Sequence, residues 1–182
     1  MRKLLFVMLM ALALAHPAEA KLLKIDYKNS KLSFTGTQAG NAFTGSFAAY
    51  VAKVDFDPQN PKAADIDVTI DMTSAKTGDM QRDQALPQKE WFDTATYPQA
   101  NFRVTSVKKI DPTHFEAKGQ LTIKTMMHDV TLPFTIAPER DGTRFKGQLT
   151  IDRTQYNVGT GQWLSDEWVA HPVTISVDLV GY

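Results

Sequence analysis

The sequence predicts an all-β protein whose antiparallel strands close into a barrel with an apolar interior. Three observations support this fold class. Apolar and polar residues alternate with a period of two over most of the chain. Short turns, rather than helices, separate the alternating segments. One stretch, around residues 79–92, lacks the alternation and carries bulky apolar side chains. A one-sided sheet with one such interruption predicts a barrel with a lid or plug.

The N-terminus has the pattern of a secretory signal peptide. Arg2 and Lys3 precede an apolar run from Leu4 to Ala15, and Ala18-Glu19-Ala20 forms a cleavage site of the small-x-small type. The run is shorter than the roughly 20 residues that span a membrane as a helix. We therefore expect residues 1–20 to be removed after Ala20, leaving no integral membrane span. The chain has no cysteine, and an exported protein without disulfides fits a bacterial periplasm.

Length and charge limit the classes of partner. Residues 21–182 form one domain by length, large enough to bury a core. Of the 20 basic and 20 acidic residues, the signal peptide holds Arg2, Lys3 and Glu19, which leaves 18 basic against 19 acidic. A net charge near minus one gives no electrostatic footprint for nucleic acid or an anionic membrane surface, so both are set aside.

Eight alternating segments are expected to form strands, in this order: residues 31–37, 43–56, 66–72, 100–110, 115–123, 130–136, 145–151 and 173–179. Turn signals lie between several of them, at Asp57-Pro58, Asn60-Pro61, Asp111-Pro112 and Asp141-Gly142. Such a meander could turn its apolar face inward in water or outward in a bilayer. Tyr182 lies on the polar face of the last segment, which favours a soluble barrel with an apolar interior.

The interruption is predicted to be a short helical insertion. Its large apolar residues are Met80, Leu86, Trp91 and Phe92, and Pro87 is expected to divide any helix into two short pieces. The Arg82-Asp83 pair is consistent with a cap plus a solvated charge, or with a salt bridge at the barrel rim. We expect the aromatic residues to close one end of the barrel.

The chain resembles the YceI-like family over nearly its whole mature length. The segments that carry the resemblance, in order, are Thr44-Gly45-Ser46-Phe47, Phe56-Asp57-Pro58, residues 67–71, Lys76-Thr77-Gly78, Arg82-Asp83, Trp91-Phe92-Asp93, Tyr97-Pro98 with Phe102, and residues 119–123. The resemblance implies an extended, lipocalin-like barrel of eight antiparallel strands with a small helical insertion. It also implies a bore that holds an amphiphilic lipid, such as a polyisoprenoid, an isoprenoid quinone or a fatty-acid derivative.

Three positions depart from the family pattern. Gln38 and Ala85 stand where family members commonly have histidine, and Thr125, followed by Met126-Met127-His128, replaces a usual turn glycine. These changes leave the barrel prediction intact. They leave the head-group contacts of a lipid open.

The residues predicted to line the bore or its mouth are Phe34, Phe43, Phe47, Phe56, Ile70, Met72, Trp91, Phe92, Phe102, Leu121, Ile123, Phe134, Trp163 and Trp168. Eight strands enclose a bore on the order of 25 Å tall, just wide enough for side chains or one slim ligand. Phenylalanine rings could fill it completely, whereas the small residues Ala100, Ala117, Gly119 and Gly147 would leave room. We expect Trp91 and Phe92, opposed by Trp163 or Trp168, to border the entrance.

The predicted function is binding, transport or storage of a long-chain lipid in the periplasm, without catalysis and without a cofactor or metal. Two alternatives compete with it. A hydrolase or isomerase would need catalytic groups, but His114, His128 and His171 belong to no known catalytic pattern. A copper or other metal binder could use Met126, Met127 and His128. The sequence leaves open which lipid binds and whether the protein forms a homodimer.

Overall fold

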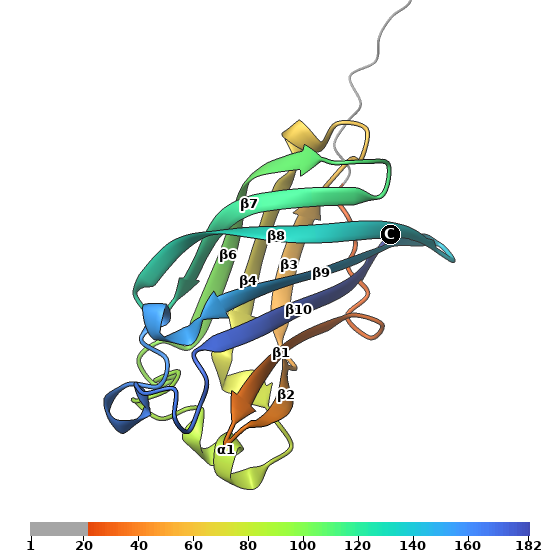
Figure 1. Cartoon of the computed structure of the whole chain (residues 1–182). Coiled ribbons are helices and arrows are strands. Elements are labelled where there is room, and N and C mark those ends of the chain that lie inside the picture. The colour runs from red at the N-terminus through yellow and green to blue at the C-terminus, as the bar shows by residue number, and fades with distance from the viewer. Residues whose placement is uncertain (1–21) are drawn as a thin grey trace, which may run out of the picture.

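A computed structural model describes residues 22–182, so the predicted signal peptide, residues 1–20, lies outside the described residues (Figure 1). The strands are β1 (Lys31–Gln38), β2 (Asn41–Phe47), β3 (Tyr50–Asp55), β4 (Asp65–Asp71), β5 (Ala75–Lys76), β6 (Gln99–Lys109), β7 (His114–Ile123), β8 (Met126–Glu139), β9 (Gly142–Asp152) and β10 (Pro172–Gly181). The described residues contain one α-helix, α1 (Met80–Ala85), and four 3-10 turns, η1 (Pro61–Ala63), η2 (Met72–Ser74), η3 (Arg153–Tyr156) and η4 (Gly161–Trp163).

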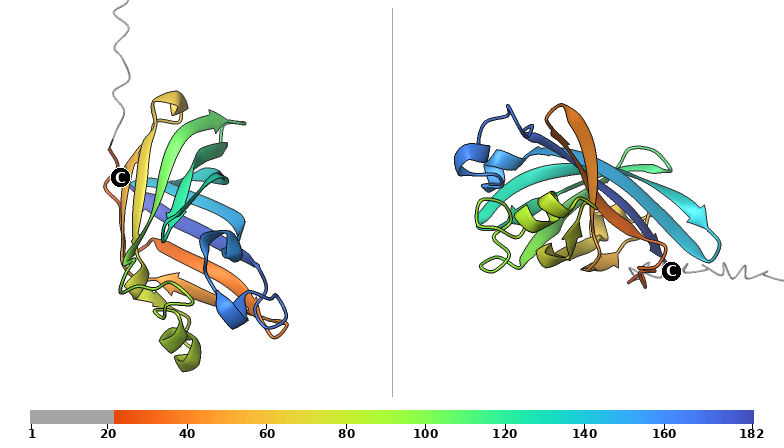
Figure 2. Two further views of the ribbon diagram at one scale, coloured as in Figure 1. Left: turned by 90° about the vertical axis from the view of Figure 1, so that its left-hand side faces the viewer. Right: turned by 90° about the horizontal axis from the view of Figure 1, so that it is seen from below.

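The ten strands form one antiparallel sheet in the order β3-β4-β6-β7-β8-β9-β10-β1-β2-β5. The sheet curls on itself, so that β4 and β6 face β9, β10 and β1 across the interior (Figure 2). The prediction of an all-β antiparallel fold with one helical insertion is confirmed. Each of the eight predicted segments contains a strand.

The second predicted segment, residues 43–56, is not one strand but two. A bend at Ala48-Ala49 separates β2, which pairs with β1 and β5, from β3, which pairs with β4. Ser74 holds the bend, because its carbonyl oxygen accepts from the N–H of Ala48 at 3.4 Å and its Oγ accepts from the N–H of Ala49 at 3.1 Å. The two halves of this bent segment lie far apart in the sheet order, β3 at one end and β2 next to β5 at the other, so the segment joins the two ends of the curled sheet.

Residues 22–27 cover the remaining seam between β3 and β10. The N–H of Leu23 donates to the carbonyl of Val54 at 2.8 Å, and the N–H of Asp26 donates to the carbonyl of Val180 at 2.9 Å. Backbone groups that would otherwise form exposed sheet edges thus find partners.

One end of the interior is filled by a phenylalanine cluster, which we call the closed end. The ring of Phe56 lies 5.3, 5.7 and 5.8 Å from the rings of Phe115, Phe134 and Phe145, measured between centroids. Each contact has edge-to-face geometry, which is favourable for aromatic pairs. Phe115 is only 1% exposed. Strand alternation delivers these rings to the inside because successive side chains point to opposite faces.

The insertion between β5 and β6, residues 77–98, forms a lid segment over the other end (Figure 2). Helix α1 begins after Asp79, whose carboxylate accepts from the N–H of Arg82 at 3.0 Å, and it ends before Pro87. Proline cannot continue a helix, because it lacks an N–H and clashes with the preceding turn. The prediction of a second helical piece is wrong, since the chain after Pro87 runs through turns.

Candidate functional site

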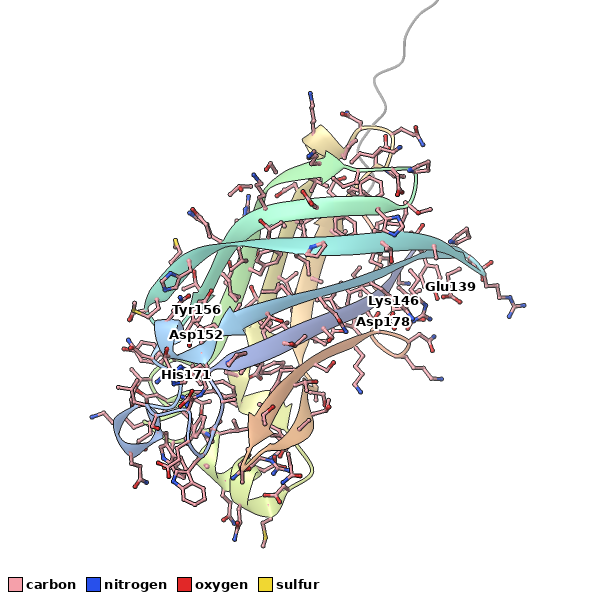
Figure 3. All side chains as sticks on the ribbon, viewed as in Figure 1. Glu139, Lys146, Asp152, Tyr156, His171 and Asp178 are labelled. Atoms are coloured by element: carbon pink, nitrogen blue, oxygen red, sulfur yellow. The ribbon has the colours of Figure 1, made fainter. Side chains whose placement is uncertain are left out.

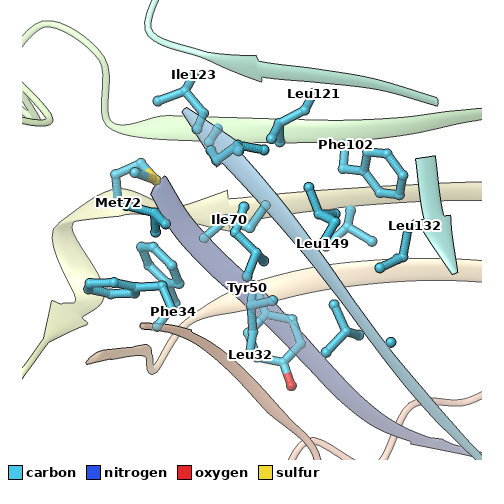
Figure 4. A pocket seen from close by; sticks show the side chains of 18 of the residues that line it. Leu32, Phe34, Tyr50, Ile70, Met72, Phe102, Leu121, Ile123, Leu132 and Leu149 are labelled. Carbon is cyan, nitrogen blue, oxygen red and sulfur yellow. The ribbon is translucent and has the colours of Figure 1, made fainter. Parts of the chain in front are cut away.

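An apolar cavity of about 200 Å³ lies inside the curled sheet. In Figure 4, side chains from opposed strands, among them Leu32, Ile70, Leu121 and Leu149, point into the same space. The wall is almost entirely apolar and includes residues from both the lid end and the closed end. A cavity of this chemistry is suited to hydrocarbon rather than to ordered water.

Small residues on the inner face help to leave this space open. Ala100, Ala117 and Gly147 line the cavity, as the sequence suggested. Gly119 does not line it, since the ring of Phe102 and the backbone of β6 occupy the space that a side chain there would need. The cavity is therefore smaller than a count of small residues on the inner faces would indicate.

Eleven of the fourteen predicted lining residues border this cavity: Phe34, Phe43, Phe47, Ile70, Met72, Trp91, Phe92, Phe102, Leu121, Ile123 and Phe134. The other three lie elsewhere. Phe56 belongs to the closed-end cluster. Trp163 packs on Trp91 with ring centroids 5.7 Å apart, and Trp168 is 60% exposed. For all fourteen residues, contact with a ligand stays a prediction.

The lid segment covers the cavity with buried side chains and is bonded to the loop after η3. Leu86 and Phe92 are 9% and 8% exposed and both line the cavity. The carbonyl of Glu90 accepts from the N–H groups of Gly159 and Thr160, at 2.7 and 2.9 Å. We call this second loop, residues 157–171, the tryptophan loop.

Arg153 organises the tryptophan loop from inside. Its guanidinium makes six hydrogen bonds to backbone carbonyls, which belong to Val158, Gly159, Trp163, Ser165, Val169 and Ala170, at 2.6 to 3.3 Å. The residue is 2% exposed, and burial lowers the pKa of its guanidinium. Arg153 also lies 5.6 Å from the centre of the Trp91 ring, so it connects the loop to the lid segment.

Sequence reasoning missed Arg153. It follows the strand segment that ends at Ile151-Asp152, where a charged residue reads as solvated. The available signal was the glycine-rich loop after it, whose carbonyl groups need donors that the loop's own backbone does not supply.

Arg82 and Asp83, whose roles the sequence left open, share one partner: Nε of Arg82 donates to the hydroxyl oxygen of Thr77 at 3.3 Å, and Asp83 accepts from the same residue. Asp83 accepts from the N–H of Thr77 at 2.6 Å and from its hydroxyl at 2.8 Å, and the backbone bond lowers the pKa of the carboxyl group. Arg82 donates to Oε1 of Gln38 at 3.1 Å and lies 4.7 Å from the centre of the Phe43 ring. Arg82 therefore fastens α1 to the ends of β1 and β2.

The histidines and methionines of the competing hypotheses do not converge. His114 contacts Asp111 at 2.9 Å, while His128 and His171 each donate to a different backbone carbonyl. Met126 packs inward and Met127 is 57% exposed, as expected for neighbours on a strand. Within residues 22–182, no group of three or more His, Cys, Asp or Glu side chains is placed to hold a metal ion.

Helices of membrane-spanning length and apolarity are absent from the described part of the chain.

Comparison with known proteins identifies the family. The YceI-like domain matches residues 23–181. Protein YceI of Escherichia coli O157:H7 is 34% identical over 122 residues, which are 64% of this chain and 63% of that protein. The matched part thus spans less than two thirds of this relative's length.

Solved structures agree on the fold. BcnA of Burkholderia cenocepacia is 34% identical and superposes with a TM-score of 0.84 over 87% of this chain and 100% of that chain. A YCEI protein of Campylobacter jejuni is 26% identical, with a TM-score of 0.66 over 76% of this chain and 84% of that chain. A domain from Saccharophagus degradans, described as polyisoprenoid-binding, is 15% identical, with a TM-score of 0.67 over 87% of this chain and 97% of that chain, and bears on the fold alone. The chain belongs to the YceI-like family.

Proposed function

We propose that this chain, as a member of the YceI-like family, binds an amphiphilic long-chain lipid in its apolar cavity, and transports or stores that lipid in the periplasm. The ligand class is a polyisoprenoid, an isoprenoid quinone or a fatty-acid derivative. The observation that carries the proposal is the continuous apolar wall, formed by residues from nine of the ten described strands and from the lid segment. The description of the Saccharophagus degradans domain as polyisoprenoid-binding is consistent with it.

The energetics favour a long hydrocarbon chain. Each methylene moved from water into an apolar site contributes about 0.8 kcal/mol. Polar anchors are therefore unnecessary for useful affinity along most of the ligand. Side chains such as Ile70, Phe102 and Leu121, which line one wall of the cavity on the neighbouring strands β4, β6 and β7, would contact the chain directly.

The proposal is one of binding rather than catalysis. The groups capable of acid-base or nucleophilic chemistry in the described residues lie mainly on the outer face or in turns, whereas the cavity wall offers almost no polar atoms. A hydrolase needs a nucleophile or an activated water next to the scissile bond. The wall supplies apolar contact instead.

The compartment follows from the N-terminal pattern. Cleavage after Ala20 would make Lys21 the first residue of the mature protein. Intact-mass measurement of the exported protein tests this point, and a retained segment of residues 1–20 would contradict it.

A matched pair of substitutions on β7 tests lipid binding. Leu121 faces the cavity and is 5% exposed, while its neighbour Gln120 lies on the opposite face. Titration with geranylgeraniol, a 20-carbon prenyl alcohol, should show affinity lost by about tenfold or more in Leu121→Asp and nearly unchanged in Gln120→Asp, since a carboxylate is strongly disfavoured in an apolar site.

Because Leu121→Asp also threatens folding, Ile123→Phe supplies a second test that keeps the wall apolar while reducing its volume. Overpacking of this kind costs about 1–3 kcal/mol, which leaves the protein able to fold. We expect a folded protein with weaker binding of geranylgeraniol. Unchanged affinity in both Leu121→Asp and Ile123→Phe would contradict binding in this cavity.

A further inference from the structure

The wall of the barrel is split between β8 and β9. The two strands pair only from Phe134↔Gly147 to Glu139↔Gly142, although β8 begins at Met126 and β9 continues to Asp152. Each strand stays paired on its other side, β8 with β7 and β9 with β10. Figure 1 shows the two strands diverging from their shared hairpin. We call the gap between residues 128–133 and 148–152 the window.

Specific residues frame the window at both of its ends. The β8–β9 ladder stops at the Phe134↔Gly147 pair. Pro133, the residue just before Phe134, has no N–H to donate. At the other end, Nε2 of His128 donates to the carbonyl of Gln155 at 3.0 Å, and its ring stands edge-on to Tyr156 with 4.9 Å between centroids. Tyr156 is 1% exposed. The unpaired stretch between β8 and β9 therefore has a defined end on each side, set by Pro133 and by the contacts of His128, and is not a frayed strand end.

A second cavity, of about 560 Å³, occupies the window and adjoins the apolar cavity. Leu149, Ile151 and Tyr156 line both cavities. Alternation along the two strands places polar side chains outside, including those of Asp129 and Thr150. The wall thus changes from polar on its outer side to apolar on its inner side within one layer of side chains, as the junction between an amphiphile's head and its chain requires.

The charges of the window have one sign. Among residues 22–182, Asp129 and Asp152 line the window together with His128 and the Tyr156 hydroxyl, and neither Lys nor Arg is a lining residue. Hydrogen bonds from Thr154 lower the pKa of Asp152 below its ordinary value. Figure 3 shows Asp152 and Tyr156 together at this end of β9.

The basic residues nearest in sequence are engaged elsewhere. Arg144 pairs with Glu139 at 2.6 Å and with Asp178 at 2.7 Å, at the hairpin end of β9. Lys146 is 3.5 Å from the same Asp178, and Figure 3 shows these groups on the hairpin side of the window. Arg153 directs its donors to the carbonyls of the tryptophan loop.

We infer that the window is the head-group site of the bound amphiphile, and that it takes a neutral or cationic head group, such as a hydroxyl, carbonyl, amide or amine, in preference to a phosphate or carboxylate. This inference rests on the proposed function. An anionic head would lie against two carboxylates, and Arg153, the cation next to Asp152, directs its donors to loop carbonyls, whereas His128, Thr131 and Gln148 offer hydrogen bonds to a neutral head. Gln148 already donates to Ser176 at 3.1 Å, which leaves its carbonyl oxygen free to accept.

If the head group instead lay at the lid end, we would expect the opposite preference in head-group charge, which makes the inference testable. Two cations lie at the lid end: Arg153, which lines the cavity but directs its donors to loop carbonyls, and Arg82, on the ring of the lining residue Phe43. At a site under the lid, these cations would favour a negatively charged head group over a neutral one. Head-group charge therefore distinguishes the two locations.

The experiment compares three ligands with the same 20-carbon prenyl chain, carrying an alcohol, an amine or a phosphate. Competition against a fluorescent prenyl probe should show the alcohol and the amine bound about tenfold more tightly than the phosphate. Asp129→Lys should raise the relative affinity for the phosphate by about tenfold. Asp141→Lys makes the same charge change in the exposed turn at the other end of the β8–β9 hairpin and should leave the ratio unchanged.

A photoreactive diazirine attached near the alcohol head group locates it directly. Crosslinks should map to residues 128–133 and 148–156. Crosslinks confined to the lid segment would contradict head-group binding in the window. So would a preference for the phosphate that is lost in Arg82→Gln but not in Asp129→Lys. Equal affinities for all three ligands would overturn the window alone, whereas failure of every ligand to bind would overturn the proposed function and the window with it.

Discussion

The two ends of the interior are built from the same kind of strand residue but differ in what covers them. At the closed end, Phe56, Phe115, Phe134 and Phe145 interlock ring against ring. At the lid end, the covering elements are non-strand segments held by hydrogen bonds of Arg153 and Arg82 and by backbone contacts at Glu90. The first arrangement leaves little space, and the second covers a cavity.

This difference suggests that the closed end contributes mainly to the free energy of unfolding and the lid end mainly to ligand binding. Dense ring packing contributes dispersion and burial that a cavity gives up, since a void has no contacts on one side. We therefore expect substitutions at the closed end to act mainly on folding. Substitutions at the lid end should act on local order and ligand retention.

The largest expected effect is that of Phe115→Ala, at the centre of the closed end. Removing a fully buried ring typically costs about 3–5 kcal/mol. Denaturant unfolding measures the loss, while titration at low denaturant measures the affinity of the folded fraction for geranylgeraniol, which should stay the same. A cost below about 1 kcal/mol would show that the closed end contributes no more than an ordinary surface site.

Arg153→Met should have the next largest effect. The variant keeps an apolar side chain of similar length but leaves six carbonyl groups without their donor, and we expect a loss of about 2–4 kcal/mol. Hydrogen exchange should accelerate across residues 157–171 and stay slow in β7. Equal acceleration in both regions would mean that the two ends unfold as one unit.

The tryptophans of the lid end offer a matched pair. Trp91 packs between Trp163 and Arg153, so Trp91→Ala should cost about 1–2 kcal/mol, while the exposed Trp168 can be replaced by alanine within about 0.5 kcal/mol. Thermal melts and lipid release rates are measured together. A Trp91→Ala protein that keeps its stability but releases lipid faster would make the lid an entrance rather than a cover.

Acid should produce the smallest effect, in the exposed β6–β7 turn at the closed end. The N–H of Thr113 and the side chain of His114 lower the pKa of Asp111 from 3.8 to about 2. A carboxyl group with a lowered folded-state pKa stabilises the protein above its unfolded-state pKa, and this contribution is lost as pH falls from about 4 to 2. Comparison of Asp111→Asn with the parent should show a difference in melting temperature that shrinks over this range. A difference that grows on acidification would contradict the sign.

Strand positions were predictable because alternation reports directly which side chains face the interior. The bend at Ala48-Ala49 was not, since its cause is the pairing of β2 and β3 with strands at opposite ends of the sheet. The turn before Met126 lies at Lys124-Thr125, where Lys124 takes a positive φ of 55° that its sequence does not suggest. These differences arise from tertiary pairing and from a strained turn, neither of which leaves a local pattern.

For the candidate site, the sequence predicts which face of each strand points inward, but not which inward residues border the cavity. Alternation assigns Phe56 and Phe102 to the inside equally, but only the packing of neighbouring rings decides that Phe56 fills the closed end while Phe102 borders the cavity. Arg153 looked solvated because its carbonyl partners come from a loop with no regular pattern. Pro133 did carry a signal, since proline within a strand indicates an unpaired edge, and the split between β8 and β9 begins there.

Native mass spectrometry tests the central claim most directly. The full chain is exported by a Gram-negative host, purified from the periplasm without detergent, and weighed before and after extraction with organic solvent. We predict the mass of residues 21–182 plus one long-chain lipid, with the lipid absent from Leu121→Asp. A ligand-free mass, together with no uptake of geranylgeraniol at saturation, would contradict the account.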